Sequence, residues 1–219
     1  MERTAMQEAD RPVSDSEHRD ESLPLPPEAR PFPSIERTIV EAVRRRESEA
    51  LGQFFEHYFD RVFGLAFRLL GSRTAAEDAT QEIFFKVHRA AHRIDPERDP
   101  APWLITITLN TCRSYWRSAT HRMSRRAVTI DSSPEPGPEI ADPQRNPEEE
   151  FAAQQRERIV QEAILDLPET LREVVLLRDY QGLDHREIAT VLQIGHDAVR
   201  KRYSRALAEL GRLLQERIP

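Results

Sequence analysis

Apolar residues recur every three or four positions in two long stretches of the chain, and this spacing is that of a helix face. Alternation at every second residue, which marks a half-buried strand, does not extend over any useful length. The apolar period predicts helices over about 51–70, 75–91, 103–118, 151–166, 168–180, 184–192 and 196–216. An all-α fold follows from this pattern.

The chain between and before these helices has a different composition. Residues 1–46 and 127–150 are polar and proline-rich, so they bury too little apolar surface to form a core. We predict a disordered N-terminal extension at 1–46, with a short helix between Ile35 and Arg46, and a flexible acidic linker at 127–150. Two small helical domains, at 47–126 and 151–219, make up the rest. Two explanations of the extension stay open. It is either a disordered tail or the product of a mis-assigned start codon, or it is an arm that inhibits the protein itself or binds a partner.

Charge and cysteine content narrow the class of protein. The net charge of −6 hides an uneven distribution, because residues 51–126 hold 12 basic against 8 acidic side chains. No acid occurs from Pro100 to Ile130, so a basic surface on the folded part is compatible with an acidic chain. The chain shows no signal peptide and no apolar run long enough for a membrane span. With Cys112 as its single cysteine, it has no internal disulfide and no Cys-based zinc site. We therefore expect a soluble cytoplasmic protein.

The stretch from Asp184 to Leu210 has the organisation of a helix-turn-helix. Asp184 and Glu187 have the spacing of a capping box at the start of a short helix. In the following helix one face is apolar, and the opposite face carries donors suited to the major groove. Gln193 stands where the turn usually has glycine, and an αα-hairpin with a solvated basic face is the simpler alternative. The predicted DNA-contacting residues for a promoter's −35 element are Arg200, Lys201, Ser204 and Arg205.

Four segments, in order and spacing, resemble bacterial RNA polymerase sigma factors of the small extracytoplasmic-function (ECF) group. They are "AEDATQEIFFKVHRA" (76–90), "WLITITLNTCRSYWR" (103–117), "LPETLREVVLLRDYQGLDHREIA" (167–189) and "AVRKRYSRALAEL" (198–210). The resemblance covers about 47–126 and 151–215. It implies a promoter-specificity subunit without enzymatic activity or cofactor, whose two domains are sigma regions 2 and 4.

The resemblance also implies partners. In the family the "EDATQEIF" helix binds the clamp of the polymerase largest subunit, and the C-terminal domain binds the flap region of core polymerase. An anti-sigma factor usually holds the free protein. Without the family, residues 77–82 are better explained as a solvated acidic first turn that the helix dipole stabilises, so the polymerase-binding role rests on the resemblance. The side chains predicted to contact core polymerase are Asp78, Gln81, Glu82 and Phe85, at i, i+3, i+4 and i+7.

Recognition of the −10 promoter element falls, by resemblance, on the third helix and the loop before it. Asn110 matches a family residue that holds a flipped base, which needs hydrogen-bond partners for its exposed edge. Ile94 stands where a Phe often lines that pocket. Arg113 and Arg117 would contact phosphates. Trp103 is either a wedge at the duplex fork or a core residue.

Other side chains have simpler explanations. Cys112 fits a small buried hydrophobe. Tyr115 and Trp116 are candidates for base stacking, with one of them expected to pack inward. His88 and His92 are four residues apart but lack a third zinc ligand in suitable spacing. Two other functions stay open at this point: a helix-turn-helix regulator that does not bind polymerase, and an enzyme, for which no nucleophile motif or phosphate loop is found.

Overall fold

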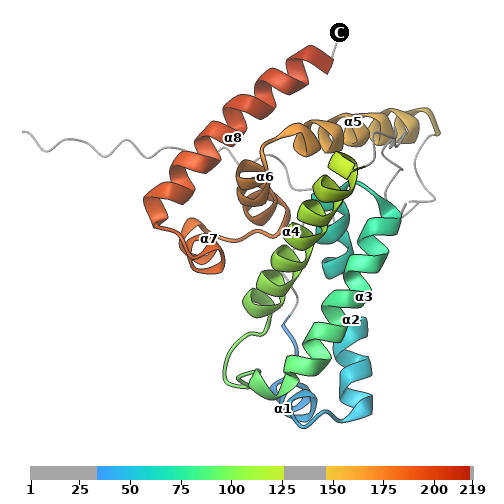
Figure 1. Ribbon diagram of the computed structural model, residues 1–219, viewed down its shortest axis with the longest axis vertical. Helices are drawn as coiled ribbons and strands as arrows, with labels where there is room; N and C mark the ends of the chain where they lie inside the picture. The colour runs from blue at the N-terminus through green and yellow to red at the C-terminus, as the bar shows by residue number, and fades with distance from the viewer. Residues whose placement is uncertain (1–33, 126–146, 218–219) are drawn as a thin grey trace, which may run out of the picture.

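A computed structural model describes residues 34–125 and 147–217, and within these ranges the side chains of 34–118 and 154–217. The described residues form helices and no strand, which confirms the all-α prediction. Most of the predicted linker and the first 33 residues lie outside the described ranges. The helices form an N-terminal module, α1–α4, and a C-terminal module, α5–α8 (Figure 1).

The N-terminal module is built on three long helices, α2 (Ser48–Leu70), α3 (Arg73–Ala90) and α4 (Ala101–Arg125). Helix α2 ends where predicted, because Gly71 adopts a left-handed φ of 72° and its N–H donates to the Phe67 carbonyl at 2.8 Å. The Ser72 side chain then caps α3 by accepting from the Ala75 N–H. A 3₁₀ turn, η1 (Ala91–Arg93), leads into the proline-rich loop before α4.

The short helix predicted near Ile35 is present as α1 (Arg37–Arg44). Its Val40 and Val43 side chains are buried and pack into the cluster formed mainly by the first half of α2 and the second half of α3. This segment therefore belongs to the folded unit rather than to the N-terminal extension in which the sequence analysis placed it. The physical reason is its apolar stripe, which α2 covers.

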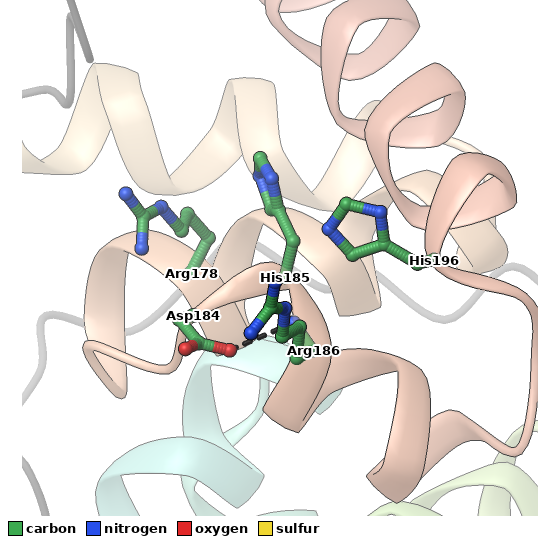
Figure 2. Close-up of a pocket in the computed structure, with 5 residues that line it drawn as sticks. All are labelled: Arg178, Asp184, His185, Arg186 and His196. Carbon is green, nitrogen blue, oxygen red and sulfur yellow. Dashed lines mark hydrogen bonds between the residues drawn. The ribbon is translucent and has the colours of Figure 1, made fainter.

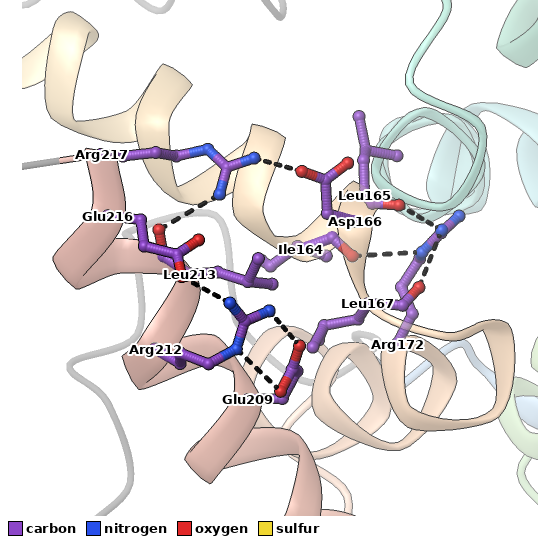
Figure 3. A network of polar contacts seen from close by, with 10 residues as sticks. All are labelled: Ile164, Leu165, Asp166, Leu167, Arg172, Glu209, Arg212, Leu213, Glu216 and Arg217. Carbon is purple, nitrogen blue, oxygen red and sulfur yellow. Dashed lines mark hydrogen bonds and ion pairs between the residues drawn. The ribbon is translucent and has the colours of Figure 1, made fainter.

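The C-terminal module contains α5 (Pro147–Asp166), α6 (Glu169–Val175), α7 (His185–Leu192) and α8 (His196–Arg217). A π-helical turn, η2 (Leu176–Tyr180), continues α6 and was not predicted. Near its C-terminus, α8 is tied to the end of α5 by an ion pair between Arg217 and Asp166 (Figure 3).

The two modules share one core. A single cluster of buried apolar residues includes Leu69 of α2 and Leu109 of α4 together with Leu177 and Ile188 of the C-terminal module. In Figure 1, α5 crosses one end of the α2–α4 bundle, and α7 lies against α4. The relative position of the modules, which the sequence did not specify, brings α6 against the helix predicted to contact the −10 element.

Candidate nucleic-acid interface

The helix-turn-helix forms as the sequence predicts. Asp184 Oδ1 accepts from the N–H groups of Arg186 (2.7 Å) and Glu187 (2.8 Å), and Glu187 Oε2 accepts from the Asp184 N–H at 2.7 Å. This reciprocal box satisfies three otherwise unpaired donors at the start of α7. The pKa of Asp184 lies below its usual range, mainly because the Glu187 N–H bonds the ionised carboxylate.

The turn between α7 and α8 places a non-glycine residue in a left-handed conformation. Gln193, which occupies the position where glycine is usual, has φ 55° and ψ 43°. Its side chain is exposed, and the Ile194 N–H donates to the Ala189 carbonyl at 3.1 Å. The usual turn geometry is thus reached without glycine, at a backbone cost of roughly 1 kcal/mol for a non-glycine side chain.

Helix α8 separates an inward face from an outward face. Val199, Tyr203, Ala206 and Leu210 are buried, and the Tyr203 hydroxyl donates to the buried Asp179 carboxylate at 2.8 Å. That hydrogen bond fixes the rotation of α8 about its axis, because few other rotations keep Tyr203 within reach of Asp179. Arg202 is half-buried, at the edge of the inward face as predicted. The outward side chains Arg200, Lys201, Ser204 and Arg205 are all exposed.

A shallow pocket borders the start of α8, the second helix of the helix-turn-helix (Figure 2). Its lining brings Arg178 of η2 and Arg186 of α7 close to His196, the first residue of α8. The His185 ring lies 5.5 Å from the Tyr203 ring and 6.1 Å from the His196 ring, centre to centre. The sequence analysis did not single out these residues, because they come from three elements and share no period. Only the spatial juxtaposition identifies them as a mixed, mainly basic rim.

Part of the predicted −10 surface on helix α4 is exposed, and part of it is covered by the C-terminal module. Asn110 and Arg117 are exposed, whereas Arg113 is half-buried against the C-terminal module. Its Nε and Nη2 atoms donate to Glu173 Oε1 and Oε2 of α6, at 2.6 and 2.7 Å, and its Nη1 donates to Asn110 Oδ1 at 3.2 Å. These carboxylate contacts raise the pKa of Arg113. Glu173 itself is 1% exposed.

Ile94 and Trp103 lie on the inside of this module. Ile94 is 5% exposed and belongs to the core cluster with Val87 and Leu104. Trp103 is half-buried and packs against the same cluster, which matches the core alternative for this side chain. In this conformation Ile94 presents no surface on which a base would stack, whereas Trp103 stays partly exposed.

The predicted polymerase-binding face of α3 is accessible. Asp78 and Gln81 are exposed, Glu82 is half-exposed with an ion pair to Lys86 at 2.7 Å, and the Phe85 ring is 61% exposed. The opposite face, with Ile83, Phe84 and Val87, is buried as predicted. An exposed aromatic side chain flanked by acids is typical of a protein-binding face.

Phe59 of α2 adds to the exposed aromatic surface. It follows the apolar period of its helix, but the structure leaves it 48% exposed. The ring stacks on Phe63 and on Phe84, at 6.1 and 6.3 Å between centres. The spacing of Phe59 in the sequence is that of a buried residue of α2. The apolar face of α2 is, however, wider than the surface that α3 covers, and only the position of α3 shows this.

Three other candidates have structural explanations. Cys112 is fully buried, which raises the pKa of its thiol to about 12. Tyr115 and Trp116 are both half-buried against the shared core, and the Arg172 guanidinium lies 5.0 Å from the Trp116 ring centre.

Within the described ranges no group of three or more His, Cys, Asp or Glu side chains is suited to a metal ion. None of the helices described there combines the length and hydrophobicity that a membrane span requires.

Comparison with known proteins identifies the family of both modules. The family model "Sigma-70 region 2" matches residues 54–122, and "Sigma-70, region 4" matches residues 157–210. RNA polymerase sigma-H factor of Pseudomonas aeruginosa is 30% identical over 81% of this chain and 92% of its own. ECF RNA polymerase sigma-E factor of Haemophilus influenzae is 29% identical over 78% and 90%.

Two solved structures share the fold. CnrH, in complex with the cytosolic domain of CnrY, matches with a TM-score of 0.60 at 24% identity, over 83% of this chain and 97% of that one. The sigma factor RpoE in complex with the anti-sigma factor NepR, from Bartonella quintana, matches with a TM-score of 0.60 at 20% identity, over 75% and 96%.

A helical module joined to a helix-turn-helix with an exposed cationic face defines a DNA-binding protein of transcription. The chain belongs to the sigma-70 family of RNA polymerase sigma factors, in its ECF group. Members of this family are regulatory subunits that direct RNA polymerase to promoters. The alternative of a regulator that acts without polymerase is not favoured.

Proposed function

We propose that the C-terminal module binds the −35 element of its promoters as duplex DNA through the outward face of α8. The observation that carries this proposal is the exposure of every predicted contact residue on one face, opposite a face that is buried throughout. Arginine and lysine at these positions suit guanine edges in the major groove, and Ser204 suits either strand's bases or phosphates. Arg178, Arg186 and His196, on the rim of the pocket, would contact the flanking phosphates.

The N-terminal module then takes the −10 element in single-stranded form. Asn110 supplies an amide for the edge of an extruded base, and Arg113 and Arg117 supply cations for the phosphates on either side. The structure supports Asn110 and Arg117 by their exposure. Ile94 and Trp103 support the site from below, as part of the core that positions the loop between η1 and α4.

Helix α3 provides the surface for core polymerase. Asp78, Gln81 and Glu82 surround the exposed Phe85 ring, an aromatic anchor with a polar rim that fits the usual anatomy of a binding hot spot. The clamp of the largest subunit is the proposed partner here, and the flap region is the proposed partner of the C-terminal module. This role also places the protein in the cytoplasm.

An anti-sigma factor is the third proposed partner. CnrH and RpoE, whose folds this chain shares, are each seen with a second protein, and for RpoE that protein is an anti-sigma factor. We propose the same class of partner for this chain. The domain boundaries that fit the described helices are α1–α4 for the polymerase and −10 functions, and α5–α8 for the −35 function.

Run-off transcription with core polymerase over a genomic promoter library tests the proposed function. We expect transcripts whose start sites share two spaced motifs, and we expect Asn110→Ala to lower open-complex formation while core binding stays intact. Co-elution with core polymerase provides the control measurement. Tight duplex binding by a chain that never co-elutes with core would contradict the proposal.

A further inference from the structure

Two of the three residues proposed to contact −10 DNA, Asn110 and Arg113, form hydrogen bonds within the chain itself. Both oxygens of Glu173 accept hydrogen bonds from the Arg113 guanidinium side by side, and its remaining nitrogen, Nη1, donates to Asn110 Oδ1. A carboxylate bound in this forked geometry presents two oxygens as a phosphate does. Glu173 comes from α6, in the other module, and is almost fully buried. It therefore stands where a DNA phosphate would be bound.

A second contact between the modules lies next to this one. Arg172, the chain neighbour of Glu173, donates to the Leu69 carbonyl at the end of α2 (2.9 Å) and covers the Trp116 ring of α4. Figure 3 shows the rest of the same guanidinium directed at backbone carbonyls that end α5. These carbonyls belong to Ile164, Leu165 and Leu167. Arg172 thus joins the ends of α2 and α5, whose last-turn carbonyls lack partners within their own helices.

A third contact depends on the absence of a side chain. A Cβ placed on Gly64, in the middle of α2, would lie 2.2 Å from the Tyr180 hydroxyl oxygen and 3.3 Å from the ring carbon that bears it. Tyr180 is 5% exposed, and the Arg68 guanidinium lies 4.5 Å from its ring centre, so the ring has little room to move away. Gly52, on the same helix, has no atom within 4 Å of the equivalent position.

We propose that Arg113 and Glu173 form an intramolecular latch that closes the two modules over the −10 surface of the free chain. This inference rests on the proposed function of α4. In the closed chain α6 and DNA compete for one guanidinium, so Arg113 contacts the −10 element only after α6 has moved away. Until DNA is bound, the partner of this surface of α4 is therefore the chain's own C-terminal module.

The balance of forces makes such a latch reversible. A buried ion pair gains little net free energy, because its Coulomb attraction mainly offsets the loss of hydration of both charges. Separation returns Glu173 to water and leaves Arg113 for a phosphate. A ligand that binds only the open form has its apparent affinity reduced by the open fraction, so the latch sets the affinity of the free chain for −10 DNA.

The first test separates the modules without changing a charge. Gly64→Ala inserts a methyl group against Tyr180, and Gly52→Ala is the matched control, with the same gain in helix propensity and no contact. Spin labels on introduced cysteines at the exposed positions His88 of α3 and Gln215 of α8 report the distance between modules in the full-length chain. The native Cys112 is buried, with a thiol pKa of about 12, and does not compete for the label.

The second test removes the latch charge. Glu173→Gln keeps the shape of the side chain, and Glu169→Gln, on the same helix and 3.9 Å from Arg113 but exposed, is its control. We expect both Glu173→Gln and Gly64→Ala to lengthen the label distance and to raise affinity for a −10 single-stranded oligonucleotide. For Glu173→Gln the expected gain is about tenfold, the usual effect of losing a charged hydrogen bond. The two controls should match the unmodified chain, and all four variants should keep its helical circular dichroism.

Unchanged label distances in both Gly64→Ala and Glu173→Gln would overturn the latch, as would separation without any gain in affinity for an oligonucleotide that the holoenzyme binds. A failure of the −10 assignment gives a different pattern. In that case the labels would separate, but neither the free variants nor the holoenzyme would bind the oligonucleotide, so the contact would stand and the proposed role of α4 would not.

Discussion

Helices α4 and α8 both carry arginines proposed to contact promoter DNA, but the chain treats them differently. Arg200 and Arg205 of α8 are exposed, and within the described ranges no ion pair engages them. Arg113 of α4 is bound by a buried carboxylate from the other module. The difference follows from the neighbours: nothing in the described structure packs on the outer face of α8, whereas α7 packs on α4 and Glu173 of α6 reaches Arg113. The −35 contacts are thus accessible in the free chain, and part of the −10 contacts are not.

The largest expected effect tests the accessible helix. Arg200→Ala combined with Arg205→Ala should weaken binding to a −35 duplex, because each side chain contributes roughly 1–3 kcal/mol if it is bidentate to a guanine. Each kilocalorie lost is roughly fivefold in affinity, so the double variant falls to the level of non-specific DNA. Fluorescence anisotropy on specific and scrambled duplexes measures this. Arg212→Ala is the control, because that exposed arginine of α8 is paired with Glu209 and Glu216.

A smaller effect distinguishes the two arginines of α4. In the holoenzyme, Arg113→Ala and Arg117→Ala should each weaken −10 binding. Each should also reduce the slope of log binding constant against log salt concentration by the amount that corresponds to about one phosphate contact. In the free chain only Arg117→Ala should weaken binding, because Arg113→Ala also releases α6. Oligonucleotide titrations at several salt concentrations, with and without core polymerase, measure both variants. Equal losses in the two settings would remove the distinction between α4 and α8.

The rotation of α8 depends on its buried face. Tyr203→Phe removes the donor to Asp179, whose carboxylate is 9% exposed, and should lower the free energy of unfolding by roughly 1–3 kcal/mol. Urea denaturation monitored by circular dichroism measures the loss. Ser204→Ala, one position along and exposed, should stay within about 0.5 kcal/mol of the unmodified chain. A Tyr203→Phe variant as stable as that control would show that the hydrogen bond does not hold the helix.

The smallest expected effect concerns the cap of α7. Asp184→Ala should lower the thermal midpoint slightly at pH 7, because the ionised carboxylate accepts two backbone N–H groups. Since folding depresses the pKa of Asp184, its contribution is present above the unfolded pKa and is lost as pH falls below it. The difference between variant and unmodified chain, followed by thermal melts from pH 7 downward, should therefore narrow in acid. A constant difference would contradict a role for the charge.

Much of the fold could be predicted from the sequence, because helix periods and caps are local signals. Gly71 and the box formed by Asp184 and Glu187 each act within four residues, and all three behave as predicted. Gln193 shows a weakness of the same reasoning: the left-handed turn forms although the residue that usually signals it is absent. The π-helical turn at η2 likewise has no distinct composition.

The unpredicted part of the site comes from contacts between distant residues. Arg113 and Glu173 are 60 positions apart, and neither is unusual in its own helix. The burial of Ile94 and the exposure of Phe59 depend on which neighbouring helix covers which part of an apolar stripe. A period shows that a face is apolar, but the width of the face that becomes covered is decided by tertiary packing.

The shared core also has a consequence during synthesis. When α4 has left the ribosome, the apolar side chains of the N-terminal module that α5–α8 cover, such as Leu69 and Leu109, still have no partner. Residues 147–217 follow at about 5–20 residues per second, so this surface stays uncovered for several seconds. A nascent chain with such a surface is a natural client for ribosome-associated chaperones until α8 is complete.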